Sequence, residues 1–319
     1  MKRYVLSRLA QAVGVLFAAF TVTFAVLYLL PSDPVALQLG AAGIETDKLT
    51  DTQLEAAKAE YGLDRPVVEQ YLSTLGGFVS GDLGTSIAKQ QPVARLIGDR
   101  LGPTISLSLV AGALSLVVGT GLAYLASYVR WRPARLVLSR LPSLGASFPQ
   151  FFIGLVAIQL FAFQLGWLPA TGSQGPESLL LPAVTISILT SSLLAQVLMR
   201  SFDDTLSQPY VVTARAKGLS RAAVQWRHGF RNAILPALTI LGVLVGLTVT
   251  SAIVVETVFA RNGVGKLAQE SVLAQDVPVV LAIVTLAAAI FVTVNLVVDL
   301  LYPLLDPRIV QVPRKVAVR

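Results

Sequence analysis

The sequence contains no cysteine and a single histidine, and only 13% of its 319 residues are charged. Without thiols the chain can form neither a disulfide nor a thiolate metal site, and one histidine excludes a histidine-rich metal centre. Soluble domains usually carry about 25% charged residues. The scarcity of charge therefore argues against a soluble domain and favours the membrane class.

Long apolar segments occupy most of the chain instead. Hydrophobic residues make up 54% of it, and the mean hydropathy is +0.70. Several apolar runs exceed the roughly 18 residues that a helix needs to cross a bilayer. A cleavable signal peptide is the alternative for the first run, but that run is too long for a typical signal core, and prolines rather than a cleavage site follow it. The sequence predicts an all-α membrane protein with six transmembrane helices, at Leu9–Leu30, Thr104–Val129, Ser143–Gly166, Leu179–Met199, Ala233–Val258 and Val277–Leu301.

The polar segments divide the chain and indicate its orientation. Residues 1–30 are predicted to form the N-terminus and first span, and residues 31–100 a small extramembrane domain. Residues 101–305 then hold five further spans with a polar loop at 200–232, followed by a tail at 306–319. Lys and Arg concentrate at the N-terminus, between the second and third spans, in the polar loop and in the tail. By the positive-inside rule, both termini and the polar loop are predicted to be cytoplasmic, with the extramembrane domain outside.

No motif in the sequence indicates catalysis. The nearest match to a phosphate-binding loop is ARNGVGKL at 260–267. Such a loop needs Gly in place of Ala260 and Ser or Thr in place of Leu267, and it must face the cytoplasm, where ATP is. Neither an HExxH nor a GxSxG pattern occurs. The basic residues are scattered over loops between apolar spans, so the net charge of +7 does not indicate nucleic acid. We predict that the chain is not an enzyme and binds neither metal nor nucleic acid.

A few polar or small residues in or near the spans invite a functional interpretation, because an ionisable side chain inside a bilayer is costly. Glu256 and Asp299 lie near opposite ends of the fifth and sixth spans, where side chains reach water, and anchoring is favoured over a role in a transport pathway. Asn295 either lines a pathway or hydrogen-bonds between helices. Gly242 and Gly246 form a GxxxG pair, which favours close helix packing.

A basic stretch without any acid, VVTARAKGLSRAAVQWRHGFRNAILP at 211–236, interrupts the apolar chain. Helical spacing predicts one apolar stripe, formed by Leu219, Ala223, Trp226 and Phe230. Upstream, residues 213–217 are predicted to form a short helical segment, which Gly218 ends by adopting a positive φ. The residues alone leave three interpretations open: a helix that docks on a partner, an amphipathic helix on anionic lipid, and a solvated loop.

Within this stretch, TARAKGLS and RHGFRNAILP resemble the cytoplasmic coupling signature of ABC-importer permeases. More narrowly, the chain resembles the dipeptide/oligopeptide and nickel permease family, in particular its first permease subunit type. The resemblance extends over nearly the whole chain through LPSDP, YGLDRP, GDLGTS, GWLPATG, VVETVFARNGVGKLAQESVLAQDVPVVLAIV and NLVVDLLYPLLDPR. It implies the type I ABC-importer permease fold, with six transmembrane helices and a small outward-facing domain between the first two.

The resemblance also implies a function and partners. The chain would be the permease subunit of an ATP-driven importer in a prokaryotic cell membrane, moving di- or oligopeptides delivered by an extracytoplasmic binding protein. Nickel, haem and glutathione are alternative substrates on the same scaffold. The implied partners are a second homologous permease subunit, forming a heterodimer, and two ATPase subunits or a fused pair. Those ATPases carry ATP and Mg, and this chain carries no cofactor.

The implied ATPase-coupling segment lies in the basic stretch. Its residues are Thr213, Ala214, Arg215, Ala216, Lys217, Gly218 and Leu219. Val212 departs from the pattern, because similar permeases usually carry Arg at that place. A secondary transporter driven by an ion gradient is the alternative from another class. It would need ionisable residues near the bilayer midplane and usually an internal repeat, and neither is visible in the sequence.

Overall fold

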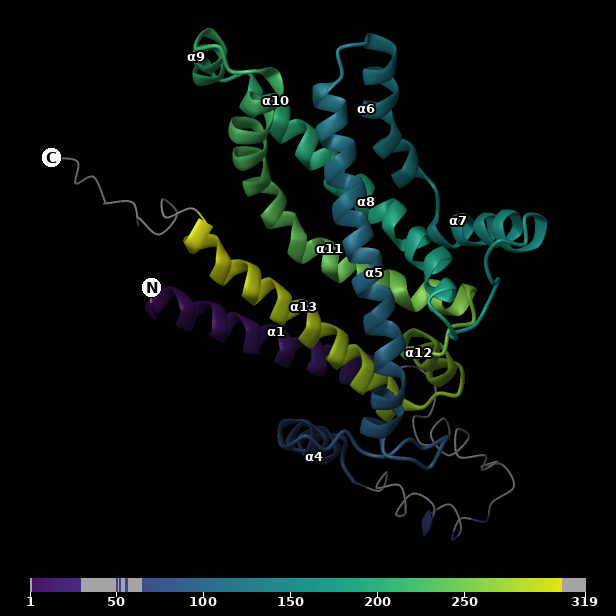
Figure 1. The fold of residues 1–319 in the computed structure, drawn as a ribbon. Helices are drawn as coiled ribbons and strands as arrows, with labels where there is room; N and C mark the ends of the chain where they lie inside the picture. Colours follow the sequence, from purple (N-terminus) through teal and green to yellow (C-terminus); the bar gives the residue numbers. More distant parts are fainter. Residues whose placement is uncertain (1, 30–49, 51, 53–54, 57–64, 306–319) are drawn as a thin grey trace, which may run out of the picture.

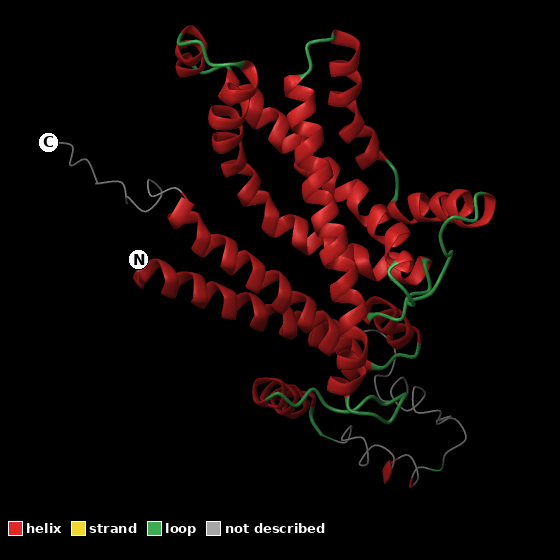
Figure 2. Cartoon of the chain, in the orientation of Figure 1, coloured by secondary structure: helices red, strands yellow, loops and turns green. Residues whose placement is uncertain are grey.

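The computed structural model describes the chain except residues 1, 30–49, 51, 53–54, 57–64 and 306–319. Most of the first half of the predicted extramembrane domain (31–100), up to residue 64, and the predicted tail lie outside the described residues. The described part consists of helices joined by loops, with no strand (Figure 2). The prediction of an all-α fold is confirmed.

Five helices of the described part are long and apolar enough to cross a membrane. They are α1 (Lys2–Leu29), α5 (Val93–Tyr128), α8 (Glu177–Leu206), α11 (Arg231–Val258) and α13 (Val277–Leu305). They correspond to the predicted first, second, fourth, fifth and sixth spans. Helix α5 starts before the predicted Thr104, because Val93, Leu96 and Ile97 are buried against α12 (Val264–Leu273) and α13.

The predicted third span, Ser143–Gly166, is not one continuous helix. Helix α6 (Arg132–Ser147) is followed by α7 (Gln150–Ala157) and a π-helical turn, η2 (Ile158–Gln164), and the two parts meet at 101°. Phe148 and Pro149 are extended at the bend. Proline lacks the N–H that a helix needs and disfavours helix in the preceding residue, which explains the break. The fold has six candidate spans only if this bent pair counts as one.

Small residues bring α5 and α8 into close contact at the centre of the bundle (Figure 1). A Cβ atom at Gly119 of α5 would lie 2.9 Å from the carbonyl oxygen of Ser191. One turn earlier, the buried hydroxyls of Ser115 and Thr190 hydrogen-bond across the same interface. Helices that lack side-chain bulk at the contact can approach closely in a membrane, where backbone proximity and polar contacts replace the hydrophobic effect between helices.

Helices α1 and α13 form an antiparallel pair at the side of the bundle (Figure 1). Phe20 and Phe24 of α1 are buried with Leu281 of α13. Near the opposite end of the pair, Nε of Arg8 lies 3.3 Å from the carboxylate of Asp299. The first and last helices are therefore held together along their length.

Two ends of the bundle carry the remaining short helices, and Figure 1 shows them far apart. Helix α9 (Pro209–Ala216), α10 (Arg221–Val224) and the π-helical η3 (Gln225–Phe230) connect α8 to α11 at one end. Helices α4 (Val67–Ser80) and α12 lie at the other. We refer to these as the α9 end and the α4 end.

Candidate functional site

The α9 end bears a helical hairpin, residues 209–230, which contains the predicted coupling segment. Val211 and Ala214 of α9 are buried together with Val224 of α10, and Leu206 and Leu219 pack against them. The hairpin therefore has a small apolar core that continues into the end of α8.

Gly218 sits at the turn of the hairpin with φ +82°, in the left-handed region. Its N–H donates to the carbonyl of Arg215 at 2.9 Å, and the N–H of Leu219 donates to the carbonyl of Ala214 at 3.3 Å. This pair of bonds is a Schellman motif, which satisfies the last carbonyls of α9. The second arm then starts with a cap, because Oγ of Ser220 accepts from the N–H of Ala223. The turn is thus closed by hydrogen bonds on both sides.

Most of the predicted coupling residues are exposed on the hairpin surface. Of the seven, only Ala214 is buried and Leu219 is half-buried. Val212, the position that departs from the family pattern, is 66% exposed. The outer surface of α9 therefore carries an exposed apolar side chain beside small residues, with Arg215 and Lys217 at the end of the helix.

The predicted apolar stripe on the second arm is partly wrong. Trp226 is 61% exposed, whereas Val224, Gln225 and Gly229 are buried. The reason is that residues 225–230 form a π-helix, whose wider turn changes which positions share a face. Trp226 instead stacks on Phe230, with ring centroids 4.9 Å apart.

Polar side chains of the second arm bind the hairpin to the end of α5. The buried Gln225 donates to the carbonyl of Tyr124 at 3.0 Å and to Oγ of Ser127 at 2.7 Å. Arg221 donates to the carbonyl of Ser127 at 3.2 Å and lies over the ring of Tyr128, 5.3 Å from its centroid. Burial lowers the pKa of Arg221, and the charges of neighbouring arginines lower it further. These contacts attach the second arm of the hairpin to the end of α5.

At the α4 end, the carboxylate of Glu256, a residue of α11, lies against the start of α12. Its carboxylate accepts from Oγ1 of Thr104 and from the N–H of Gly265, both at 2.7 Å. Oγ1 of Thr104 in turn accepts from the N–H of Val264 at 2.8 Å. A Cβ atom at Gly263 would collide with the carboxylate. Gly263 and Gly265, in the segment 260–267 that partly matches a phosphate-binding loop, thus leave space for the carboxylate of Glu256.

The prediction that the side chain of Glu256 reaches water is wrong, because it is fully buried. Its carboxylate faces positive partial charge at the start of α12, since the first N–H groups of a helix have no partner within the helix. The contact ties together α5, α11 and α12.

Three further charged residues at this end, Arg261, Glu270 and Asp276, bind segments that are distant in sequence, and the sequence analysis missed them. The buried Arg261 donates from Nη1 to the carbonyl of Ser178 at 2.8 Å. The buried Asp276 accepts from Oγ of Ser86 and from the N–H of Ile87. Arg261, Glu270 and Asp276 all lie in the block VVETVFARNGVGKLAQESVLAQD. Their partners, however, are distant in sequence.

Glu270 binds two cations of other segments. Its Oε2 lies 2.9 Å from Nζ of Lys89 and 3.3 Å from Nη1 of Arg100. Burial raises the pKa of this carboxyl, but the hydrogen bond from Lys89 and the charges of Arg100, Lys89 and Lys266 outweigh burial. The pKa of Glu270 therefore lies below its usual 4.5.

The other residues singled out from the spans lie between α11 and α13. A Cβ atom at Gly246 would lie 2.6 Å from the ring of Phe291, and one at Gly242 would collide with the amide of Asn295. The amide nitrogen of Asn295 donates to its own helix, at the carbonyl of Phe291. The two glycines thus lie where α11 approaches α13.

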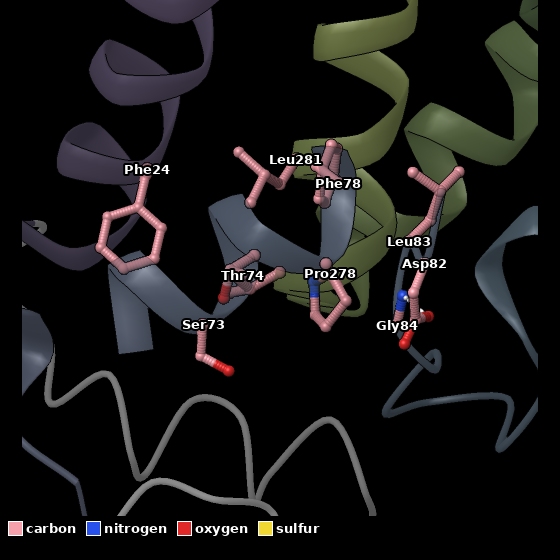
Figure 3. Close-up of a pocket in the computed structure, with 11 residues that line it drawn as sticks. Phe24, Ser73, Thr74, Phe78, Asp82, Leu83, Gly84, Pro278 and Leu281 are labelled. Atoms are coloured by element: carbon pink, nitrogen blue, oxygen red, sulfur yellow. Dashed lines mark hydrogen bonds between the residues drawn. The ribbon is translucent and has the colours of Figure 1, made fainter. Parts of the chain in front are cut away.

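A cavity of about 240 Å³ opens at the α4 end between α1, α4 and α13 (Figure 3). Phe24 and Phe78 face it together with Thr74 and Pro278 (Figure 3). The carboxylate of Asp82, at its edge, accepts from the N–H of Gly84 at 2.9 Å. The cavity mixes apolar and polar lining, and among the described residues that line it only Asp82 is ionisable.

Five long apolar helices, with the bent pair as a sixth candidate span, are typical of a multi-pass membrane protein. Residues 103–311 match the family model "Binding-protein-dependent transport system inner membrane component", and residues 1–108 match the model of its N-terminal part. The chain belongs to this family, whose members are the permease subunits of ABC importers.

Relatives and solved structures agree with this assignment. The glutathione transport system permease proteins GsiC of Escherichia coli and Shigella flexneri are 36% identical over 310 residues, 97% of this chain and 99% of theirs. The fold is similar to an amino acid ABC transporter (TM-score 0.50, 19% identity, 67% of this chain and 94% of that one). It is also similar to the inward-facing MetNI methionine ABC transporter (TM-score 0.53, 15% identity, 66% and 96%).

The chain is therefore a multi-pass permease subunit of an ABC importer of the bacterial inner membrane. In this family the ATPase is carried by separate chains, and the permease subunit is itself non-catalytic. The family name also implies a binding protein as a partner.

Proposed function

We propose that this permease imports small peptides, with glutathione among its substrates. Two observations support a peptide-like solute. Relatives that align over nearly the whole chain are named glutathione transport system permease proteins, and glutathione is itself a small peptide. The sequence motifs also resemble the dipeptide/oligopeptide family rather than sugar-type permeases.

The hairpin at the α9 end docks on the ATPase subunits and acts as the coupling element. The observation that carries this proposal is the attachment of the hairpin to α5 through Gln225 and Arg221. A coupling element has to move as a rigid body with the spans, and a hairpin with its own core, a closed turn and anchors on α5 meets that requirement. The exposed Val212, Thr213 and Ala216 present a small, largely apolar surface suited to a groove.

This assignment gives the subunit an orientation and partners. The α9 end and both termini lie in the cytoplasm, and the α4 end faces outward, where a binding protein delivers the solute. A second, homologous permease subunit completes the pathway, and two ATPase subunits or a fused pair dock on the two coupling hairpins. ATP binding closes the ATPases and shifts the spans between outward-facing and inward-facing arrangements.

Transport by the reconstituted complex tests the proposal. The chain is co-expressed with permease, ATPase and binding-protein subunits of its own genome, and the purified complex is placed in proteoliposomes that contain ATP. We expect uptake of radiolabelled glutathione or a dipeptide that depends on ATP and the binding protein. Uptake of nickel or haem, with no competition by either peptide, would overturn the peptide assignment. Uptake driven by an ion gradient without ATP would overturn the proposed coupling.

A further inference from the structure

Two adjoining cavities at the α9 end are lined by arginines from different segments. The first, about 170 Å³, is bounded by Arg135 of α6 together with Arg215 and Arg221 of the hairpin. The second, about 380 Å³, is bounded by the same two hairpin arginines and by Arg130, from the loop between α5 and α6. The two cavities share Arg215 and Arg221, so four arginines line them in all, and we call the two together the arginine-lined space.

This positive charge is largely uncompensated within the described residues. The one carboxylate that lines either cavity there is that of Asp203, 3.8 Å from Arg135, and both side chains are more than half exposed. Exposed pairs of this kind are weak. Across the described part of the chain, no carboxylate lies within ion-pair distance of Arg130, Arg215 or Arg221.

Neutral groups of the protein hold one of these arginines, Arg221, in place beside the others. Arg221 is fixed by the carbonyl of Ser127 and by the ring of Tyr128, and its pKa is lowered by burial and then by Arg130 and Arg215. Guanidinium groups are planar forks whose N–H donors match the oxygen atoms of a phosphate. A multiply charged oxyanion would neutralise the cluster and use these donors together.

We propose that this arginine-lined space is a binding site for a phosphate-bearing anion, supplied either by the head group of an anionic phospholipid or by a soluble phosphate. The position suits a lipid source, because the site lies at the end of α5, where a span ends. Trp131 is 71% exposed and Trp226 is 61% exposed beside it. Tryptophan is enriched at membrane interfaces, and basic clusters at the cytoplasmic surface attract anionic lipid.

A bound phosphate has a mechanical consequence, which rests on the proposed coupling function. Arg215 belongs to α9, whereas Arg130 belongs to the loop between α5 and α6 and Arg135 belongs to α6. An anion that contacts both sides adds a link between the hairpin and the spans. Anionic lipid should therefore increase ATP-driven uptake, whereas binding itself requires neither ATP nor transport.

Binding is tested on the complete transporter, purified with its natural partner chains and stripped of lipid in a neutral maltoside detergent. The probes are dioctanoyl phosphatidylglycerol, dioctanoyl phosphatidylcholine as the neutral lipid, and inorganic pyrophosphate. Native mass spectrometry measures the occupancy of each probe. The variants are Arg130→Gln and, as matched control, Arg132→Gln, which removes the same charge two residues away from a side chain that lines neither cavity.

We expect binding of phosphatidylglycerol, pyrophosphate or both, with affinity about tenfold weaker in Arg130→Gln and unchanged in Arg132→Gln, as for loss of one charged hydrogen bond. Binding of the lipid alone identifies the head group as the source, and binding of pyrophosphate alone identifies a soluble phosphate. Equal weakening in both variants would show nonspecific charge attraction and overturn the proposal. The absence of binding by either phosphate probe would also overturn the proposal. This includes the case in which Arg130→Gln weakens retention of the ATPase subunits, because the arginines would then bind the ATPase instead of a phosphate. Failure of this test leaves the coupling proposal intact, since that proposal is judged by uptake.

Discussion

The hydroxyl of Thr104 joins three helices, and its removal provides a sharp test of how the α4 end is held together. It donates to Glu256 of α11 and accepts from the N–H of Val264 of α12, while Thr104 itself belongs to α5. Thr104→Val replaces this hydroxyl by a methyl group of nearly the same size. The substitution therefore removes two hydrogen bonds with little change in packing.

The expected loss in the free energy of unfolding follows from the two polar groups that lose a hydrogen-bond partner. The N–H of Val264 loses its acceptor, and the carboxylate of Glu256 loses one donor while it stays buried. A buried polar group left without a partner costs about 1–3 kcal/mol, and hydrogen bonds to charged groups are worth about 1.5–3 kcal/mol. Thr104 is only half-buried, so water recovers part of this loss. We expect a destabilisation of about 2–3 kcal/mol.

The measurement is the free energy of unfolding in mixed SDS and maltoside micelles, with protease resistance of the segment 259–276 as a local readout. Ser106→Ala is the matched control, because that hydroxyl donates only to the carbonyl of Pro103 in its own helix. A double-mutant cycle of Thr104→Val with Glu256→Gln should give a coupling of about 1 kcal/mol or more. Additive effects, or a loss no larger than in the control, would refute the assigned network.

Three further outcomes are expected. Gly218→Val should abolish uptake at normal expression, whereas Gly218→Asn should keep most of it, because φ +82° strains a β-branched residue but is tolerated by Asn; equal uptake by the two variants would contradict this. The lowered pKa of Glu270 means that its carboxylate stabilises the fold fully above pH 4.5 and progressively less as the pH falls through the lower folded value. The thermal midpoint of the natural chain should therefore exceed that of Glu270→Gln at pH 7 and converge with it below pH 4.5; a constant gap would argue against the ion pairs. Gly246→Leu should lower the thermal midpoint, because the new side chain pushes the ring of Phe291 away. Adding Phe291→Ala to the same chain should restore part of the loss, and the thermal midpoints of both variants in detergent measure this.

The places of five membrane helices followed from apolar run lengths. The runs at 9–30 and 277–301 correspond to α1 and α13 with small differences at the ends. The third span was the exception, because hydropathy measures the apolar content of a window of residues. It carries no information on whether the helix bends within that window. The extended Phe148 and Pro149 turn that segment by 101°.

The candidate site was only partly predictable. Gly218 was identified from its place after a helical run, because the signal for a helix end is local. The buried side of the second arm was not, since the stripe assumed an ordinary helical period and residues 225–230 form a π-helix. The anchors of the hairpin, Gln225 and Arg221, gave no recognisable signal because their partners lie about a hundred residues earlier in α5.

By itself, the sequence determined the membrane class, the all-α fold and the family, because these depend on composition, apolar run length and ordered motifs along the chain. Only the tertiary structure decided what the isolated charges do. Glu256 binds the start of α12, and four arginines line two adjoining cavities at the α9 end. The physical reason is that the free energy of a buried charge depends on its partners in space. Folding brought those partners from segments as far apart as Thr104 and Glu256.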